Sequence, residues 1–303
     1  MAATWIDLLD PTAEELHAQS PRELEESAIE LILENPEHDD EPRPTLHGHG
    51  DYIFGIFLVA VVDQQADSVF YQQVDVVITH DTLLTIRKTP PGNRPPYDLT
   101  TVREAAKPDD SPGMLAYRIV DDVAERYLDL VDDLDAEIDE LEDDVESQTA
   151  ELTRQRISAL RHDMLHIRRT LGPMRDAVRR VTVNACEVDA GPEVFPDDVE
   201  VAFNAVYDKL MRALDGLELT RDLLAGVRDY HQAQISNSQN EVMKRLTVIA
   251  SLLLVPTFIV GLYGQNFRHI PELGWHYGYE FSWALIVGTT LFQLWWFRRS
   301  RWF

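Results

Sequence analysis

Two amide side chains, Gln265 and Asn266, close a membrane-length apolar segment and are placed to contact an ion. The segment, residues 246–267, holds 22 residues without a charge. A helix needs about 20 apolar residues to cross a bilayer, and hydrocarbon cannot satisfy a polar side chain. The amides must therefore face water, protein or an ion, which makes them candidates for a functional site.

A second apolar run covers residues 281–297, only 13 residues further on, and ends in aromatic side chains typical of a membrane interface. Lys244 and Arg245 precede the first run, and three arginines follow the second, whereas the intervening loop has only Arg268 as a basic residue. Positive-inside counting then predicts a two-span hairpin with both chain ends in the cytoplasm. A buried helical hairpin in a soluble core is the alternative.

The charge of the whole chain narrows its function. It has 53 acidic and 27 basic residues, a net charge of −26, which argues against nucleic-acid binding and suits a protein that attracts cations. We find no nucleophile–base arrangement and no phosphate-cradling loop, so we expect neither an enzyme nor a cofactor. His47 and His49, and likewise His162 and His166, have metal-binding spacings, but we expect a solvated loop and a solvent-facing pair.

The first 110 residues predict an α/β domain, a sheet with packed helices. Residues 5–9, 52–62, 69–79 and 83–87 have strand composition, and residues 12–33 give helical signals with a start at Ser20-Pro21. Residues 34–50 and 89–96 predict loops.

Helical patterns follow from residue 113. A heptad seam indicates packing, and 14 of the 26 residues from 121 to 146 are acidic. The acids fit either a solvated face or a cation-attracting surface. The seam consists of Tyr127, Val131, Leu134, Ile138, Leu141 and Val145. We expect the next helix, residues 149–183, to pair with this acidic helix in antiparallel fashion. Most of its basic cluster would then have a structural role. That cluster comprises Arg161, Arg168, Arg169, Arg175, Arg179 and Arg180.

One further helix is predicted to run from residue 197 into the first span, over roughly 66 residues or about 100 Å. A rod of that length implies a stalk bundled with copies of itself. The expected domains are 1–110 (α/β), 111–195 (acidic and basic helices), 196–245 (stalk), 246–267 (first span), 268–280 (outer loop), 281–297 (second span) and 298–303 (basic tail).

Residues seven apart along this helix form one small or mildly polar stripe, while bulky apolar residues occupy the other faces. Small residues also mark close helix packing, so the stripe alone fits a pore wall and a tight helix seam equally well. The amides at its end favour a pore. The stripe comprises Asp229, Ala233, Ser236, Asn240, Met243, Thr247, Ala250, Leu254, Thr257, Gly261 and Gly264.

The motif Tyr263-Gly264-Gln265-Asn266-Phe267 resembles the Tyr-Gly-Met-Asn-Phe hallmark of the CorA family of divalent-cation channels. Pro271-Glu272-Leu273 in the loop and Asn240-Glu241-Val242-Met243-Lys244 in the stalk are similar to family patterns as well. The resemblance implies a homopentameric funnel whose first span lines the pore. It also implies passive Mg²⁺ influx, with Co²⁺ and Ni²⁺, across the bacterial inner membrane, closed by intracellular Mg²⁺.

Carried onto this sequence, the resemblance places Asn266 in the outer ring that holds the hydrated ion, shaped by Gly264 and Tyr263. Thr257, Leu254, Met243 and Asn240 line the pore below that ring. Leu246 lies near the hydrophobic constriction, Asp229 near the cytoplasmic neck and Glu272 at the mouth. Periodicity favours Thr247 over Leu246 as pore-facing.

Two positions depart from the family pattern. Gln265 stands where magnesium channels usually have methionine, and relatives linked to zinc have other residues. Ala205 stands where some members place a regulatory aspartate, with Asp208 one turn on, so the regulatory carboxylates are not assigned. A zinc transporter, with or without proton coupling, and a membrane-tethered acidic scaffold or sensor without transport are the alternative functions.

Overall fold

The computed structural model describes residues 3–34, 42–63, 68–92, 94–183, 194–265, 274–300 and 302. The chain forms two compact units, Met1–Arg228 and Asp229–Phe303. The first unit holds a five-stranded mixed sheet in the order β1-β5-β4-β3-β2, in which β1 and β5 are parallel and the other pairs antiparallel. The strands are β1 (Thr4–Leu9), β2 (Thr45–Gly48), β3 (Ile53–Asp63), β4 (Ser68–Ile78) and β5 (Thr82–Arg87).

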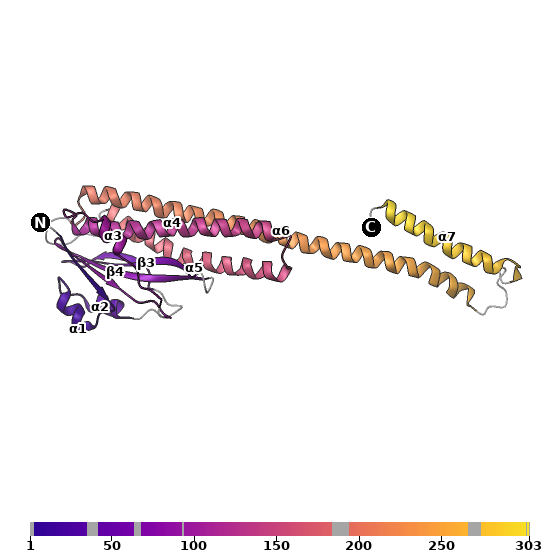
Figure 1. The fold of residues 1–303 in the computed structure, drawn as a ribbon, viewed down its shortest axis with the longest axis horizontal. Helices are drawn as coiled ribbons and strands as arrows, with labels where there is room; N and C mark the ends of the chain where they lie inside the picture. The colour runs from indigo at the N-terminus through magenta and orange to yellow at the C-terminus, as the bar shows by residue number, and fades with distance from the viewer. Residues whose placement is uncertain are drawn as a thin grey trace. The chain divides into compact units, whose positions relative to one another are not determined.

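Helices cover both faces of the sheet in the first unit (Figure 1). Helices α1 (Ala13–Gln19) and α2 (Glu26–Leu33) pack on one face, around Leu16, Ile32 and Leu84. The other face carries the larger core, which α4 (Pro112–Asp144), α5 (Ala150–Thr182) and the first part of α6 (Asp197–Tyr263) share. A short helix, α3 (Thr100–Ala105), contacts α4. The α/β fold predicted from the sequence is thus present.

Most strand and helix predictions agree with the structure to within one or two residues. The start signal at Ser20-Pro21 was misplaced: the Ser20 hydroxyl donates to the Arg22 carbonyl, and α2 begins only at Glu26. Thr12 and Glu15 form a capping box at the start of α1 instead. The predicted loop 34–50 contains the edge strand β2, which composition alone did not reveal.

The seam of α4 is buried as predicted, with Tyr127, Ile138 and Leu141 at most 1% exposed. The observed ion pairs differ from the expectation that the basic cluster of residues 149–183 pairs with the acidic helix before it. Arg156, outside the predicted cluster, pairs with Asp144 of α4, and Lys209 of α6 pairs with Asp121 and Glu125 of α4.

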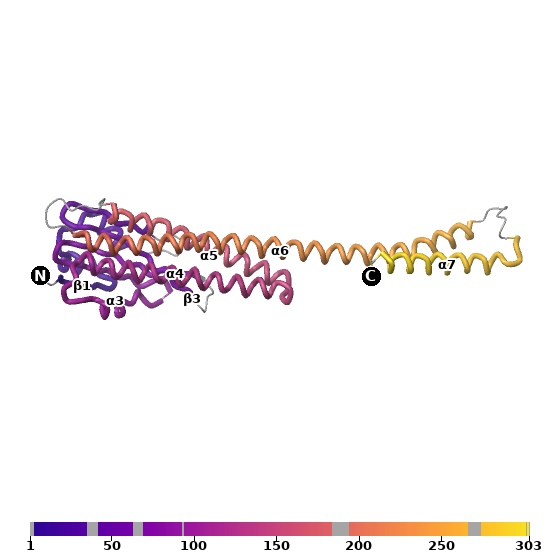
Figure 2. Tube along the Cα trace, turned by 90° about the horizontal axis from the view of Figure 1, so that it is seen from above, coloured from indigo at the N-terminus to yellow at the C-terminus, as the bar shows by residue number. Residues whose placement is uncertain are grey.

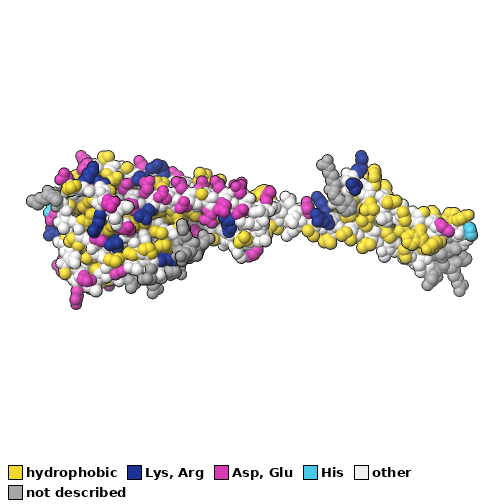
Figure 3. All heavy atoms as spheres, in the orientation of Figure 1, with side chains coloured by type: hydrophobic (Ala, Val, Ile, Leu, Met, Phe, Trp, Pro, Cys, Tyr) yellow, Lys and Arg dark blue, Asp and Glu magenta, His cyan; other side chains and the backbone are white. Residues whose placement is uncertain are grey.

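Members of the predicted arginine cluster bind elsewhere. Arg168 pairs with Glu218 of α6, and Arg180 lies 2.9 Å from Nδ1 of His47. Asp121 and Glu125 lie one helical turn apart, so one lysine of α6 contacts both carboxylates. Many carboxylates of α4 remain on the surface (Figure 3).

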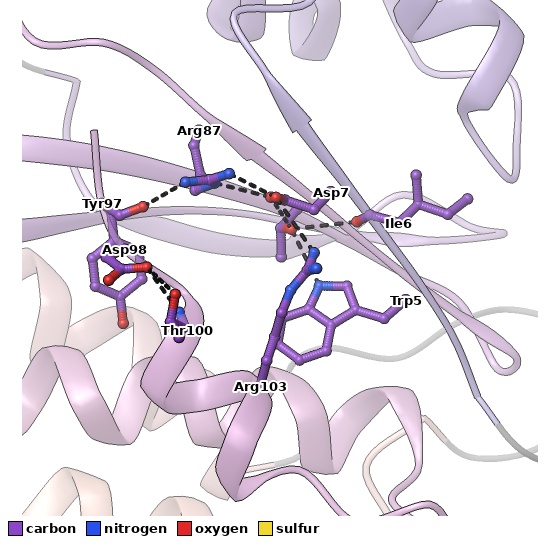
Figure 4. Close-up of polar contacts among 9 residues, drawn as sticks. Trp5, Ile6, Asp7, Arg87, Tyr97, Asp98, Thr100 and Arg103 are labelled. Carbon is purple, nitrogen blue, oxygen red and sulfur yellow. Dashed lines mark hydrogen bonds and ion pairs between the residues drawn. The ribbon is translucent and has the colours of Figure 1, made fainter. Parts of the chain in front are cut away.

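A half-buried carboxylate, that of Asp7, joins the edge strand β1 to its neighbours (Figure 4). It accepts from Arg87 Nη2 at 2.7 Å and Nε at 3.0 Å, and from the Thr85 hydroxyl at 2.8 Å. Arg103 of α3 lies 3.4 Å from the same carboxylate and over the Trp5 ring. Bidentate pairing of this kind fixes geometry as well as charge, so it registers β1 on β5 and holds α3 beside them.

A second carboxylate, that of Asp75 on β4, is fully buried and accepts a hydrogen bond from Gln73 Nε2 at 2.8 Å. Lys88 is also buried; its Nζ donates to the Leu31 and Glu34 carbonyls at the end of α2. Burial raises the pKa of Asp75 to about 7, against the opposing attraction of Lys88 and the hydrogen bond from Gln73. The folded chain therefore keeps this proton at pH values where the unfolded chain, with an ordinary aspartate, has lost it.

A pH-dependent loss of stability follows from Asp75. Between about pH 4 and pH 7 the folded state binds more protons at Asp75 than the unfolded state does. The free energy of unfolding therefore decreases as the pH rises through this range. We expect Asp75→Asn to gain thermal stability relative to the parent protein when the two are compared at pH 8 rather than pH 5. A stability difference independent of pH would contradict this assignment.

Candidate functional site

The second unit is built from the last part of α6 and from α7 (Gly278–Arg299). Among the described residues, α6 is the one helix long and apolar enough to cross a membrane, and most of its apolar stretch is exposed in the single chain. Its exposed side chains there are largely hydrophobic (Figure 3). This agrees with the predicted first span. The second span, which α7 covers with 22 residues, stays a prediction.

Helix α7 packs along one face of α6, and the two lie side by side in both views (Figures 1 and 2). Val248 is 1% exposed and Ile259 7%, and the side chains of Leu252 and Val255 between them are half-buried. Gln293 Nε2 of α7 donates to the Ser251 carbonyl of α6 at 3.3 Å. These positions recur every three or four residues, so α7 fixes which face of α6 is covered.

The predicted stripe lies on the uncovered side of α6, and each of its eleven residues is exposed in the single chain. At about 100° per residue, the stripe is centred roughly opposite Val248. Leu254 is 70% exposed and Met243 60%. Leu246 and Thr247 are both exposed and flank the centre of the stripe, so the single chain does not choose between them.

The hydroxyl groups of the stripe donate back to the helix. Thr247 Oγ1 donates to the Met243 carbonyl at 2.8 Å, and Thr257 Oγ1 donates to the Leu253 carbonyl at 2.7 Å. Ser236 makes the same contact with Gln232 at 3.0 Å. A hydroxyl has one hydrogen, so each of these oxygens presents only acceptor lone pairs to the exposed face. Such a face can accept hydrogen bonds from the water shell of a cation.

The stripe ends where the helix ends. Tyr263 is the last residue of α6; Gly264 N–H donates to the Val260 carbonyl at 2.9 Å and Gln265 N–H to the Leu262 carbonyl at 3.3 Å. A Cβ at Gly264 would lie 3.1 Å from the Val260 oxygen, so glycine keeps this terminus uncrowded. The carbonyl end of a helix carries partial negative charge and favours cations.

Two predicted site residues, Asn266 and Glu272, lie outside the described residues. The structure brings Tyr263, Gly264 and Gln265 together at the end of the stripe, about 50 Å along the helix axis from Asp229 at 1.5 Å per residue. Sequence reasoning missed the Gln293 contact to α6. A lone glutamine within the apolar run 281–297 was the available signal, because an amide in a span needs a polar partner.

The histidine pairs do not form a metal centre. His47 lies on β2 rather than in a loop, and His49 stacks on Tyr52 with its Nδ1 3.2 Å from Glu25. Burial, followed by the nearby Arg180 charge, lowers the pKa of His47. His162 and His166 stack on each other at 6.2 Å. The described part of the chain contains no group of three or more histidine, cysteine or carboxylate side chains that could hold a metal ion.

Comparison with known proteins gives a match across nearly the whole chain. The family model described as CorA-like Mg²⁺ transporter protein matches residues 2–299. The Cobalt/magnesium transport protein CorA of Thermotoga maritima is 28% identical over 266 residues, 86% of this chain and 73% of that protein. The Zinc transport protein ZntB of Photorhabdus laumondii is 26% identical over 148 residues, 48% of this chain and 43% of that protein.

The fold is also shared with a solved structure. The complete structure of the CorA magnesium transporter from Methanocaldococcus jannaschii superposes with a TM-score of 0.78 at 22% identity. The alignment covers 99% of this chain and 91% of that one. The likeness therefore includes the α/β unit, the long helix α6 and the helix that follows it.

Thiol labelling tests which face of α6 is accessible. The sequence has one cysteine, Cys186, so a Cys186→Ser background allows single cysteines to be placed at will. If the exposed stripe faces a water-filled path, we expect Leu254→Cys to react with a small water-soluble thiol reagent in the membrane. Val248→Cys, covered by α7, is the control and should stay unlabelled. Equal labelling at both positions would contradict the arrangement.

Proposed function

Because the chain belongs to the CorA-like Mg²⁺ transporter family, we propose that it forms a homopentameric channel for divalent cations. Mg²⁺ would enter the cell passively through it, with Co²⁺ and Ni²⁺ as further substrates. The observation that carries the proposal is the exposed stripe on α6, free of charge above Asp229 and ending at Gly264 and Gln265.

A pore explains the stripe better than a helix seam does. The covered face of α6 is already occupied by α7 within the same chain, and the bulky side chains Leu253 and Phe258 remain exposed on other faces. In a ring of five copies those bulky residues meet lipid and neighbouring helices, while the small and polar stripe faces the axis. A plain seam gives no reason for the acceptor oxygens of Thr247 and Thr257 or for the terminal amides.

The chemistry suits a hydrated ion. Mg²⁺ keeps its waters tightly and prefers octahedral oxygen coordination. In our proposal a ring of Asn266 amides, shaped by Tyr263, Gly264 and Gln265, accepts hydrogen bonds from those waters. Neutral amides bind weakly enough for the ion to leave, whereas a carboxylate ring would retain it. Glu272 lies at the mouth and concentrates cations.

Below this ring the proposed pore is lined by Thr257, Gly261, Leu254, Ala250 and Asn240, and Asp229 marks its cytoplasmic neck. Leu254, Met243 and Leu246 or Thr247 form the narrow hydrophobic part, which closes by dewetting. An inside-negative potential favours entry of a divalent ion by about 4.6 kcal/mol per 100 mV.

In our proposal both termini lie in the cytoplasm, and α7 is the second span of the inner membrane. Lys244 and Arg245 at one end and Arg298 and Arg299 at the other support this orientation. Intracellular Mg²⁺ would close the channel by bridging carboxylates of adjacent subunits. The exposed acids of α4 provide abundant negative charge, and the bridging pairs are not assigned.

Zinc transport is the second candidate function, because Gln265 replaces the usual methionine and a zinc transport protein is among the relatives. The third, a tethered acidic scaffold or sensor, requires neither ion flux nor a pentamer. Mass measurement of the purified protein in detergent separates the third candidate from the others.

Removal of the Asn266 amide tests the pore assignment. We expect Asn266→Ala to reduce Mg²⁺ uptake into proteoliposomes at least tenfold, because the ring that holds the ion's waters is lost. Asn204→Ala, an exposed asparagine of the first unit, is the matched control and should transport normally. Undiminished uptake by Asn266→Ala would overturn the assignment.

Ion preference is tested by comparing Mg²⁺, Co²⁺ and Zn²⁺ flux with and without a pH gradient. A passive magnesium channel predicts Mg²⁺ flux that follows the membrane potential and ignores the pH gradient. Zn²⁺ flux that needs the gradient would favour the second candidate instead. If the main-chain turn rather than the Gln265 side chain shapes the ring, Gln265→Met should have an Mg²⁺ flux within about threefold of that of the parent protein.

A further inference from the structure

A cavity of about 430 Å³ lies in the first unit between residues 42–44 and α5, distant in sequence from the stripe. Among the described residues its lining includes three guanidinium groups, those of Arg43, Arg168 and Arg169, and the His166 ring. Such a concentration of positive charge is unusual in a chain with a net charge of −26. The volume lies within the range of small-molecule sites, about 300 to 1,000 Å³.

Arg168 is paired with Glu218 at 3.2 Å, whereas Arg43 and Arg169 make no ion pair with any described residue. Both are exposed side chains. Arg43 and Arg169 thus bring two guanidinium groups to one cavity, from segments more than 120 residues apart.

The base of the cavity is rigid. Thr170 is 4% exposed, and its hydroxyl lies 3.0 Å from the hydroxyls of Tyr127 and Tyr71. His166 rests on the Tyr71 ring at 5.1 Å, which ties the cavity wall to β4. Fixed surroundings of this kind lower the ordering cost of binding.

We propose that this cavity binds a phosphate-bearing small molecule, with the guanidinium groups of Arg43 and Arg169 holding the phosphate. The planar guanidinium fork matches phosphate oxygens and forms paired, charge-assisted hydrogen bonds with them. The bound anion would tie the segment before β2 to α5. Repulsion of cations by the same arginines makes the cavity unsuitable for the transported ion, so the proposal is independent of the pore.

The test is titration of the full-length protein in detergent with pyrophosphate and with ATP, in magnesium-free buffer, followed by calorimetry and thermal unfolding. We expect saturable binding and a rise in unfolding temperature, since a ligand of the folded state stabilises it. Binding of both probes identifies the phosphate as sufficient; binding of ATP alone identifies a nucleotide. Adenosine, which has no phosphate, should not bind.

The Arg43→Ala, Arg169→Ala double variant should weaken binding of the probe at least tenfold. Arg154→Ala, an exposed arginine on the same helix outside the cavity, is the matched control and should bind normally. Arg43→Ala alone gives the same comparison if the double variant fails to fold. The proposal is overturned if neither probe binds the parent protein, if adenosine binds as well as ATP, or if the variants bind like the control.

Discussion

The arrangement of the second unit depends on one constraint: a helix long enough to span a membrane carries polar side chains that hydrocarbon cannot satisfy. Helix α7 covers the face of α6 around Val248 and Ile259 and leaves the opposite face open. The open face holds Asn240, Thr247 and Thr257 and ends at Gly264 and Gln265. Among the described residues no helix covers this face, and in our proposal association with further copies around water covers it.

The first unit carries a large excess of acidic residues. Its carboxylates lie in three kinds of surroundings. Asp7 is half-buried against Arg87 and Arg103, Asp75 is buried with a raised pKa, and much of the α4 charge stays in water. The exposed carboxylates are accessible to cations in solution, which is why the proposed closure by Mg²⁺ rests on the surface of α4. Arg43 and Arg169 make no ion pair with a described residue and line the cavity beside α5.

Periodicity predicted the parts of the fold that depend on one local pattern. The α4 seam and the unbroken α6 from Asp197 to Tyr263 both follow from apolar spacing and the lack of interrupting signals. Proline 256 lies inside α6 without ending it, since a helix in or near a membrane tolerates proline when packing supplies compensation. Strand β2 was missed because an edge strand of four residues has too few side chains to show alternation.

Ion pairing was the least predictable feature, because composition gives the charges of α5 but not their orientation. Arg168 points to Glu218 of α6 and Arg180 to His47 of β2, contacts that only the packing of distant segments determines. The candidate stripe, by contrast, could be identified from a seven-residue spacing. Its exposure is visible in the structure, and its role as a pore wall remains our proposal.

An electron cryo-microscopy structure of the full-length protein in lipid nanodiscs tests the central claim most directly. The account predicts five copies around one axis, with Leu254, Thr257 and Gly261 of each α6 facing a water-filled path that leads to the Asn266 ring. A structure in which these residues face lipid, or are buried in a two-helix seam without a central path, would contradict it.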